Sequence, residues 1–187
     1  MRKNRNCFRR PAMKTIALFA SATLLSACSQ LPVSIYADTP IQFDPMSFFN
    51  NQIHAEGFVR DRSGEVSRTF TAQISATWDE QGGVLDELFT WSDGEIQTRV
   101  WQFRKTGEQT YVGTAADVIG DAQMEFAGNA IHMNYVLDVP LASGKNIGIR
   151  MDDWLYQVSD NSIVNVTSMS KFGFSVGEVV LTMRVID

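Results

Sequence analysis

Apolar and polar side chains alternate along the stretch Val66-Ser67-Arg68-Thr69-Phe70-Thr71-Ala72-Gln73-Ile74-Ser75-Ala76-Thr77-Trp78. All six odd positions are polar, and the seven even positions are apolar except for Arg68. A period of two residues places every second side chain on the same face of an extended strand, whereas a helix needs a period of about 3.6. The stretch therefore predicts a long β-strand with one face in an apolar core.

Two later stretches show the same alternation. It is carried by Ile131, Met133, Tyr135, Leu137 and Val139, and again by Val179, Leu181, Met183 and Val185. Turn-forming residues separate the predicted strands at 61–64, 81–83, 93–94, 106–107, 128–129, 143–144 and 160–161. Connections this short make neighbouring strands antiparallel, because a parallel crossover needs about a dozen residues or more.

The predicted fold is all-β. A meander of about nine or ten strands would leave two long exposed edges, and closing the sheet removes both. We therefore expect an antiparallel up-and-down meander closed into a lipocalin-like (calycin-like) barrel, with an open, strongly bent sheet as the alternative. A transmembrane barrel is disfavoured, because charged residues lie on both faces of several strands. A short helical turn is expected near the N-terminus, where Asp44 can cap a turn that begins at Pro45 and carries Phe48 and Phe49.

The N-terminal segment has the pattern of a bacterial lipoprotein signal. Leu25-Ser26-Ala27-Cys28 closes an apolar run, residues 15–25, that follows several basic residues. This run is much shorter than the ~20 residues that span a bilayer, so it predicts a signal peptide. We expect a signal peptide over 1–27, a lipidated tether over 28–43 and a single β-barrel domain over 44–187. Met1 and Met13 both fit as the start.

Cleavage before Cys28 would let its thiol carry the lipid, which makes the membrane the first expected partner. Ser29 stands where an Asp commonly retains lipoproteins at the inner membrane. The expected location is therefore the periplasmic face of the outer membrane. Since Cys28 is the one cysteine left after cleavage, the sequence offers neither an internal disulfide nor a cysteine-based zinc site.

Charge and residue spacing exclude several classes of function. Residues 1–27 hold six of the 16 Lys and Arg and none of the 21 Asp and Glu, so cleavage leaves a formal net charge of −11. Such a balance disfavours nucleic acid as a partner. His54 and His132 have no metal-binding spacing, and no serine lies in a Gly-x-Ser-x-Gly elbow. We therefore expect no metal, no cofactor and no enzymatic activity.

The Asp93-Gly94 turn predicts the register of one hairpin. With a two-residue loop, Leu88 lies opposite Arg99 and Asp86 lies opposite Trp101. This register brings Asp86, Arg99 and Trp101 within diagonal reach on one face. Inside a barrel, such a group can bind a polar headgroup above an apolar chain. On the outside, it is an ordinary solvent-facing ion pair, and this reading stays open.

Two other acidic positions have weaker signals. Asp152 and Asp153 are adjacent, and adjacent strand residues point to opposite faces, so the two cannot form a carboxylate dyad without a bulge. Asp117 lies in a stretch of small residues, 113–120, whose glycine spacing does not match a phosphate-binding loop.

Taken together, the motifs resemble those of the bacterial lipoprotein family catalogued as domain of unknown function 3833. The matching blocks extend over nearly the whole mature chain and include Ala55-Glu56-Gly57, Leu85-Asp86-Glu87, Asp93-Gly94-Glu95, Arg99-Val100-Trp101, Asp117-Val118-Ile119-Gly120, Gly128-Asn129-Ala130, Asp152-Asp153-Trp154 and Ser170-Lys171-Phe172-Gly173. The resemblance implies a calycin-like fold, no established activity and a lipid-related role. It also implies a shared site that includes Arg99, Trp101, Asp117, Asp153 and Lys171.

Three hypotheses of function remain. The first is a lipid-anchored barrel that binds a lipid or another small apolar ligand, and it predicts a cavity of several hundred Å³ around Arg99 or Trp101. Its candidate ligand-binding residues are Asp86, Arg99, Trp101, Asp117, Asp153 and Lys171. The alternative is a structural or assembly protein that docks an envelope protein through an exposed apolar patch. An enzyme ranks last, because it requires at least two of Asp117, Asp153 and Glu87 to converge beside Arg99 within hydrogen-bond reach.

Overall fold

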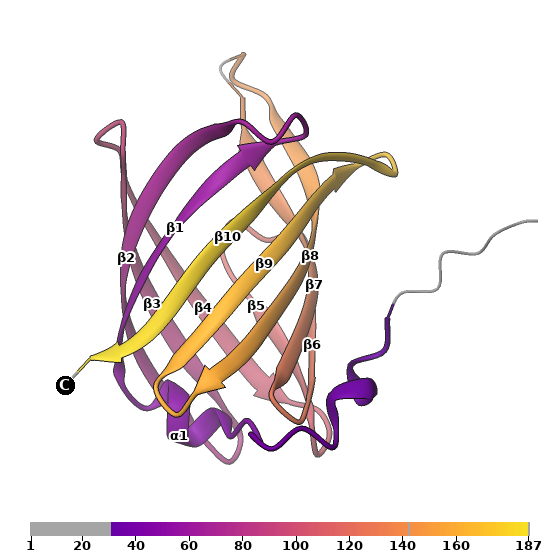
Figure 1. Ribbon diagram of the computed structural model, residues 1–187. Coiled ribbons are helices and arrows are strands. Elements are labelled where there is room, and N and C mark those ends of the chain that lie inside the picture. Colours follow the sequence, from indigo (N-terminus) through magenta and orange to yellow (C-terminus); the bar gives the residue numbers. More distant parts are fainter. Residues whose placement is uncertain (1–30, 142, 187) are drawn as a thin grey trace, which may run out of the picture. The chain divides into compact units, whose positions relative to one another are not determined.

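The computed structural model describes residues 31–141 and 143–186, and Leu31–Asp187 form one compact unit. Within the described residues, ten antiparallel strands form one closed barrel (Figure 1). The strands are β1 (Gln52–Asp61), β2 (Val66–Asp79), β3 (Gly82–Trp91), β4 (Ile96–Lys105), β5 (Thr110–Thr114), β6 (Ala122–Ala127), β7 (Ala130–Pro140), β8 (Asn146–Ser159), β9 (Ser162–Lys171) and β10 (Phe174–Ile186).

Each strand pairs with its neighbours in sequence, and β1 pairs with β10 to close the sheet. The predicted closed meander is thus confirmed, and the open sheet is not formed. Closure satisfies both edges that an open meander would leave unpaired. The predicted signal peptide and Cys28 lie outside the described residues.

The alternation in β2 determines which face points inward. Its apolar even positions from residue 70 onwards are buried, namely Phe70, Ala72, Ile74, Ala76 and Trp78. The exception, Arg68, lies near the end of the barrel, where its Nη2 bonds to Asp93 at 2.7 Å and to Glu95 at 2.8 Å. Its guanidinium also lies 4.1 Å from the Trp91 ring centroid. An ion pair and a cation–π contact therefore explain why this position tolerates a charge.

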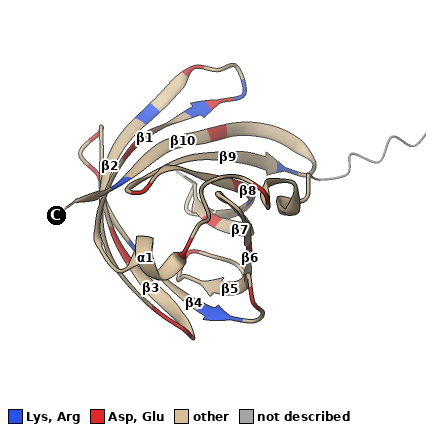
Figure 2. Ribbon diagram, turned by 60° about the horizontal axis from the view of Figure 1, so that its bottom comes forward, with Lys and Arg blue, Asp and Glu red and all other residues tan. Residues whose placement is uncertain are grey.

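A short helix, α1 (Pro45–Phe49), closes one end of the barrel, as Figure 2 shows from below. Asp44 caps it by accepting a hydrogen bond from the Met46 amide at 3.1 Å. Phe48 and Phe49 are buried, and the Phe49 ring stacks on Trp78 with centroids 5.3 Å apart. The predicted helical turn is confirmed, and it supplies an aromatic floor to the interior.

The segment before α1 packs against the outside of the barrel. It contains a short 3-10 helix, η1 (Val33–Tyr36), in which Val33 is buried. The Tyr36 ring makes edge contacts with Trp154 and Tyr156. Phe43, at the other end of the segment, is buried in the interior core against Phe48 and Phe49, so the expected tether is held on the barrel near both ends of residues 33–43. No helix among residues 31–141 and 143–186 is long and apolar enough to cross a membrane.

Candidate functional site

The barrel encloses a cavity of about 640 Å³. This volume lies within the range of roughly 300–1,000 Å³ that is typical of small-molecule sites. Aromatic side chains make up much of the lining, and they are Phe49, Phe70, Trp78, Phe89, Trp91, Trp101, Phe103 and Tyr135. The predicted aromatic cavity around Arg99 and Trp101 is therefore present.

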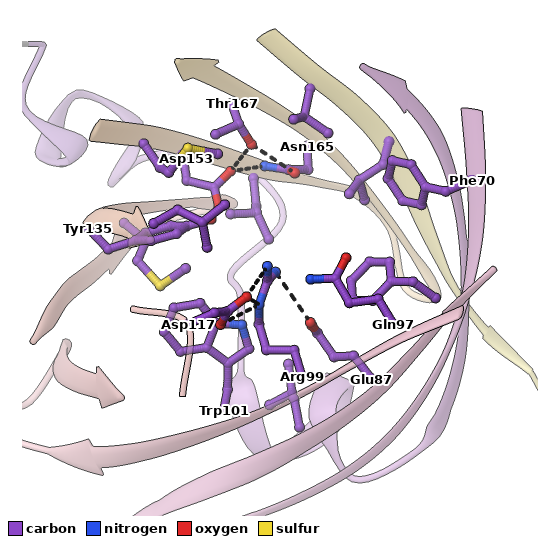
Figure 3. A pocket seen from close by; sticks show the side chains of 18 of the residues that line it. Phe70, Glu87, Gln97, Arg99, Trp101, Asp117, Tyr135, Asp153, Asn165 and Thr167 are labelled. Atoms are coloured by element: carbon purple, nitrogen blue, oxygen red, sulfur yellow. Dashed lines mark hydrogen bonds and ion pairs between the residues drawn. The ribbon is translucent and has the colours of Figure 1, made fainter. Parts of the chain in front are cut away.

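Arg99 projects from β4 into this cavity and organises its charged groups (Figure 3). Its Nε lies 3.0 Å from both carboxylate oxygens of Asp117, and its Nη2 donates to Asp117 Oδ2 at 2.8 Å. Its Nη1 lies 3.8 Å from Glu87 Oε2, since Glu87 is the direct partner of Arg99 in the β3–β4 register. One guanidinium group therefore faces two carboxylates.

Asp117 reaches Arg99 because its loop, residues 115–121, pairs with β7. The Asp138 amide donates to the Asp117 carbonyl at 2.8 Å, and the Ile119 amide donates to the Val136 carbonyl at 2.8 Å. These bonds hold the loop beside the sheet where β5 and β6 are short. The small-residue stretch thus allows a tight backbone path that presents one carboxylate to the cavity.

Glu87 is the most unusual group in the cavity. Its side chain is buried, and its Oε2 has no hydrogen-bond partner. The pKa of Glu87 is raised from 4.5 to about 7, chiefly by burial; Arg99 opposes this rise, and the charges of Asp117 and Asp153 add to it. A carboxyl group that changes charge near neutral pH therefore faces the cavity.

A second polar group lies across the cavity on β8 and β9. Asp153 Oδ1 accepts hydrogen bonds from Asn165 Nδ2 and from Thr167 Oγ1, both at 2.5 Å. Burial raises the pKa of Asp153, although these two hydrogen bonds act in the opposite direction. Tyr135 on β7 also lines the cavity, and burial raises the pKa of its hydroxyl well above 10.

The structure corrects the predicted β3–β4 register by one residue. Asp86 pairs with Val100 instead of Trp101, and Arg99 pairs with Glu87 instead of Leu88. The loop has three residues, 92–94, because Trp91 and Glu95 still bond across it and Gly94 has φ 87°. A glycine in the left-handed region is the mark of a three-residue hairpin loop with a bulge. Asp86 is therefore exposed on the outer face, and the prediction that it joins Arg99 and Trp101 is wrong.

The other predicted residues separate into two groups. Trp101 is buried in the cavity wall, where it stacks on Phe103 and makes an edge contact with Tyr135. Arg99, Asp117 and Asp153 line the same cavity. Lys171 does not belong to the lining, and its Nζ donates to the Gly148 carbonyl at 2.5 Å.

The sequence analysis did not identify several polar residues of the lining as candidate ligand contacts. The predicted two-residue loop places Glu87 opposite Val100, on the other face of the hairpin from Arg99, so the sequence nominates Glu87 only under the enzymatic hypothesis. Tyr135 belongs to the alternating stretch in β7, so its inward position follows from that pattern. Asn165 and Thr167 show no such signal, because both are polar side chains at buried positions.

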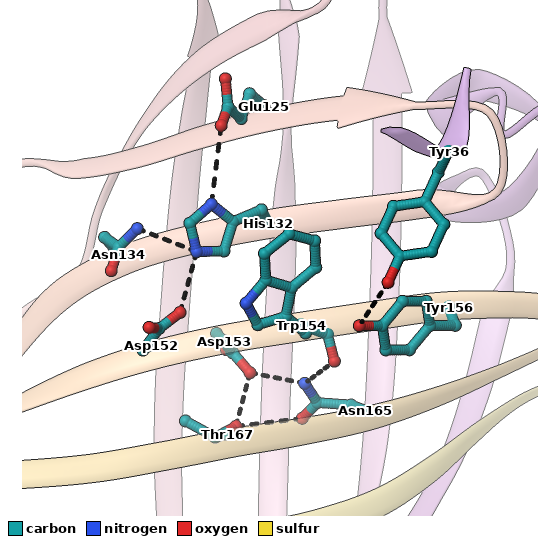
Figure 4. A network of polar contacts seen from close by, with 10 residues as sticks. All are labelled: Tyr36, Glu125, His132, Asn134, Asp152, Asp153, Trp154, Tyr156, Asn165 and Thr167. Atoms are coloured by element: carbon teal, nitrogen blue, oxygen red, sulfur yellow. Dashed lines mark hydrogen bonds and ion pairs between the residues drawn. The ribbon is translucent and has the colours of Figure 1, made fainter. Parts of the chain in front are cut away.

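A separate polar network lies on the outer face of β7 and β8 (Figure 4). His132 Nε2 lies 2.8 Å from Asp152 Oδ1, and its ring stacks on Trp154 with centroids 4.2 Å apart. Asp152 therefore faces away from Asp153, which confirms that the two carboxylates cannot form a dyad. No group of three or more His, Cys, Asp or Glu side chains in the described ranges is arranged to hold a metal ion.

Comparisons with known proteins support the fold. Residues 22–185 match the family described as "Protein of unknown function (DUF3833)". No curated protein matches the chain. Among solved structures, the S-type phycobiliprotein lyase CPES from Guillardia theta is similar, with a TM-score of 0.54 and 8% identity over 73% of this chain and 87% of that chain. At this identity, the likeness shows a shared lipocalin-like barrel fold.

Proposed function

The chain belongs to the DUF3833 family of proteins of unknown function, and we propose that it is a non-enzymatic binding protein whose barrel holds a lipid or another small apolar molecule. One observation carries the proposal: a cavity of about 640 Å³ combines an aromatic lining with buried charged groups. A sheet closed only for stability would fill its interior with close-packed side chains. Buried charges also cost stability unless they are fully paired, so recognition of a ligand gives them a role.

An enzymatic role has less support. Asp117 is hydrogen-bonded to Arg99, but Glu87 Oε2 stays 3.8 Å from the nearest guanidinium nitrogen, which is longer than a hydrogen bond. Asp153 bonds to Asn165 and Thr167 on another wall. Asp117 alone of the three is within hydrogen-bond distance of Arg99, and we therefore favour binding over acid–base catalysis.

Docking of an envelope protein is a second candidate function, and one observation favours it. At the β9–β10 hairpin, Phe172 is 87% exposed and Phe174 is 75% exposed. Two large aromatic side chains in water are typical of a contact surface. Ligand binding requires an open cavity, whereas docking through an outer surface does not. A variant that fills the cavity therefore distinguishes the two functions.

Extraction of the purified compact unit with organic solvent, followed by mass spectrometry, tests the binding function. We expect a stoichiometric apolar molecule in the wild type and little in Leu181→Trp, because Leu181 lines the cavity and an indole there occupies ligand space. Thr182→Trp is the matched control, since Thr182 is the exposed neighbour on the same strand. A ligand-free wild type, or equal extraction from both variants, would favour docking instead.

The location is part of the proposal. We infer that Cys28 carries a lipid that anchors the barrel to the outer membrane on its periplasmic side, as the signal-like segment predicts. Two or more acyl chains anchor stably, whereas one chain is marginal. Metabolic labelling with palmitate is expected to mark the wild type and not Cys28→Ser. Labelling of the variant at the wild-type level would disprove the anchor at this residue.

A further inference from the structure

We propose that the cavity selects amphiphiles whose polar end is a hydrogen-bond donor, above all a protonated amine, and disfavours those that end in a carboxylate. This inference rests on the proposed binding function and specifies the chemistry of its ligand. It follows from which polar atoms in the cavity are already bonded and which are not.

Carboxylates of the protein already occupy donor positions on both cavity arginines. Asp117 already occupies the Nε and Nη2 of Arg99, the edge of the guanidinium that a ligand carboxylate would bind in a fork. Arg68, nearer the end of the barrel, is bonded to Asp93 and Glu95. The donors left on these arginines include the Nη1 of Arg99, which faces Glu87 at 3.8 Å, and the Nε of Arg68, whose guanidinium is bonded to two acidic side chains. An incoming carboxylate that used either donor would therefore lie beside a carboxylate of the protein.

The charges of the lining favour a cation. The lining residues that the structure describes include two arginines, Arg68 and Arg99, and five acidic residues, which are Glu87, Glu95, Asp117, Asp138 and Asp153. Each arginine is already paired with at least one carboxylate. Because the acidic side chains are in excess, a positive group entering the cavity reduces like-charge repulsion, and a negative group adds to it.

Two buried carboxyl groups on the cavity wall each have an oxygen that makes none of the side-chain hydrogen bonds described above. Glu87 is 6% exposed, and its Oε2 has no hydrogen-bond partner. Both side-chain hydrogen bonds of Asp153 end on Oδ1, which leaves Oδ2 for another donor. These carboxylates lie on opposite walls with Arg99 between them (Figure 3). An ammonium group, with three donors and no acceptor, fits such a site.

The apolar chain of the ligand has a separate place. Trp78, Trp101 and Phe103 line the cavity toward α1, where Phe49 closes it. These rings offer no charge to a ligand and bury an alkyl chain at about 25 cal/mol for each Å² removed from water. The cavity thus pairs an aromatic floor with an acidic middle, so the ligand is an amphiphile with its amine among the carboxylates.

Three probes with the same chain and different polar ends test the proposal. Dodecylamine, dodecanol and dodecanoate are titrated at pH 8 into the compact unit, each below its solubility limit or micelle concentration, with isothermal calorimetry as the readout. We expect the amine to bind at least about tenfold more tightly than the carboxylate, with the alcohol between them. Carboxylate binding as tight as that of the amine would overturn the inference.

Variants then locate the selectivity. Glu87→Gln is expected to weaken amine binding about tenfold while changing alcohol binding little, because it removes a charge and keeps the shape. Asp153→Asn gives a second, independent variant from the opposite wall. Asp86→Asn is the matched control, since Asp86 is the exposed neighbour of Glu87. An amine affinity unchanged in both cavity variants would contradict the assignment.

Failure of the inference and failure of the proposed function give different results. If all three probes bind equally and Leu181→Trp abolishes binding, the cavity binds apolar chains and only the selectivity is wrong. If no probe binds the wild type, both the binding function and this inference fall.

Discussion

Replacement of Arg99 by methionine is expected to lower the free energy of unfolding by about 3–5 kcal/mol at pH 8. Arg99 bonds Asp117 through two nitrogens and faces Glu87, so its loss leaves two carboxylates in the cavity without a counter-charge. Removing one partner of a buried ion pair costs far more than the pair itself contributes. Equilibrium urea denaturation at fixed pH measures the change.

Arg68→Met is the control for this prediction. Arg68 also bonds two carboxylates, but its side chain is 32% exposed, compared with 14% for Arg99. Water solvates the carboxylates that Arg68 leaves behind, so the expected loss is about 1 kcal/mol or less. Equal losses in the two variants would show that the cavity is wetter than its lining indicates.

A combined variant separates pairing from packing. If the cost of Arg99→Met comes from uncompensated carboxylates, the triple variant Arg99→Met/Glu87→Gln/Asp117→Asn is expected to recover most of the lost stability. Recovery is expected because all three groups are then neutral. A triple variant no more stable than Arg99→Met would assign the loss to packing of the arginine side chain.

The fold could be predicted from local pattern because a barrel strand has two very different faces. In β2, the apolar set that includes Phe70 and Ile74 is buried, and the intervening polar residues are exposed. The positions of the turn residues set the lengths of the strands. Because connections this short cannot form parallel crossovers, an antiparallel meander is the simplest topology. Ring closure between β1 and β10 follows from the need to remove edges, although the pattern of neither strand specifies its partner.

The site was predictable only in part, because its geometry depends on details that alternation does not encode. The dipeptide Asp93-Gly94 suits a two-residue loop and also a three-residue loop with glycine at its end. Here the Ser92 amide bonds to the Thr69 carbonyl at 2.9 Å, a contact with the neighbouring hairpin that accompanies the longer loop. A shift of one residue in register moves every side chain of a strand to the other face. The two-residue loop would place Asp86 on the same face as Arg99, whereas the observed three-residue loop places Glu87 there.

Asp117 illustrates a second limit. Its block resembles the family motif, but its place beside Arg99 depends on backbone bonds between the 115–121 loop and β7. Those partners are far apart in sequence, and no periodic pattern links a loop to a strand. The sequence could therefore nominate Asp117 for the site without showing that it already neutralises the arginine.

Glu87→Gln is expected to stabilise the protein by about 3 kcal/mol at pH 8 and to have little effect at pH 4. The folded-state pKa of Glu87 is about 7, against an ordinary value of 4.5, and each unit of difference corresponds to about 1.4 kcal/mol. Below about pH 4.5 the carboxyl is neutral in both folded and unfolded chains, so its burial has no ionisation cost. The free energy of unfolding of the wild type therefore falls as pH rises through about 7, because the folded chain must then ionise a buried group.

Urea denaturation of the wild type and Glu87→Gln between pH 4 and pH 8 measures this difference. Arg99 lowers the pKa of Glu87, whereas Asp117, Asp153 and, least of these, the neighbouring Asp86 raise it. Asp86→Asn is the control, because its exposed carboxylate is expected to change stability by no more than about 0.5 kcal/mol at any pH. A stability difference between the wild type and Glu87→Gln that does not grow with pH would show that Glu87 is solvated in the folded barrel.

A stabilising Glu87→Gln variant that also loses amine binding would connect stability with function. Gln keeps the size of the side chain and removes its charge, so a more stable variant would show that the barrel does not need the carboxylate for folding. Under the proposed binding function, a carboxylate that destabilises its own fold by about 3 kcal/mol at pH 8 has its role in the contact with the ligand. If an ammonium group binds beside Glu87, it favours the ionised form of the carboxyl and offsets the cost of burying that charge.

The wild type with a bound amine is then expected to approach the stability of the ligand-free Glu87→Gln variant at pH 8. Thermal unfolding with and without dodecylamine measures this gain in stability. A wild type that dodecylamine does not stabilise at pH 8 would separate the cost of Glu87 from ligand binding.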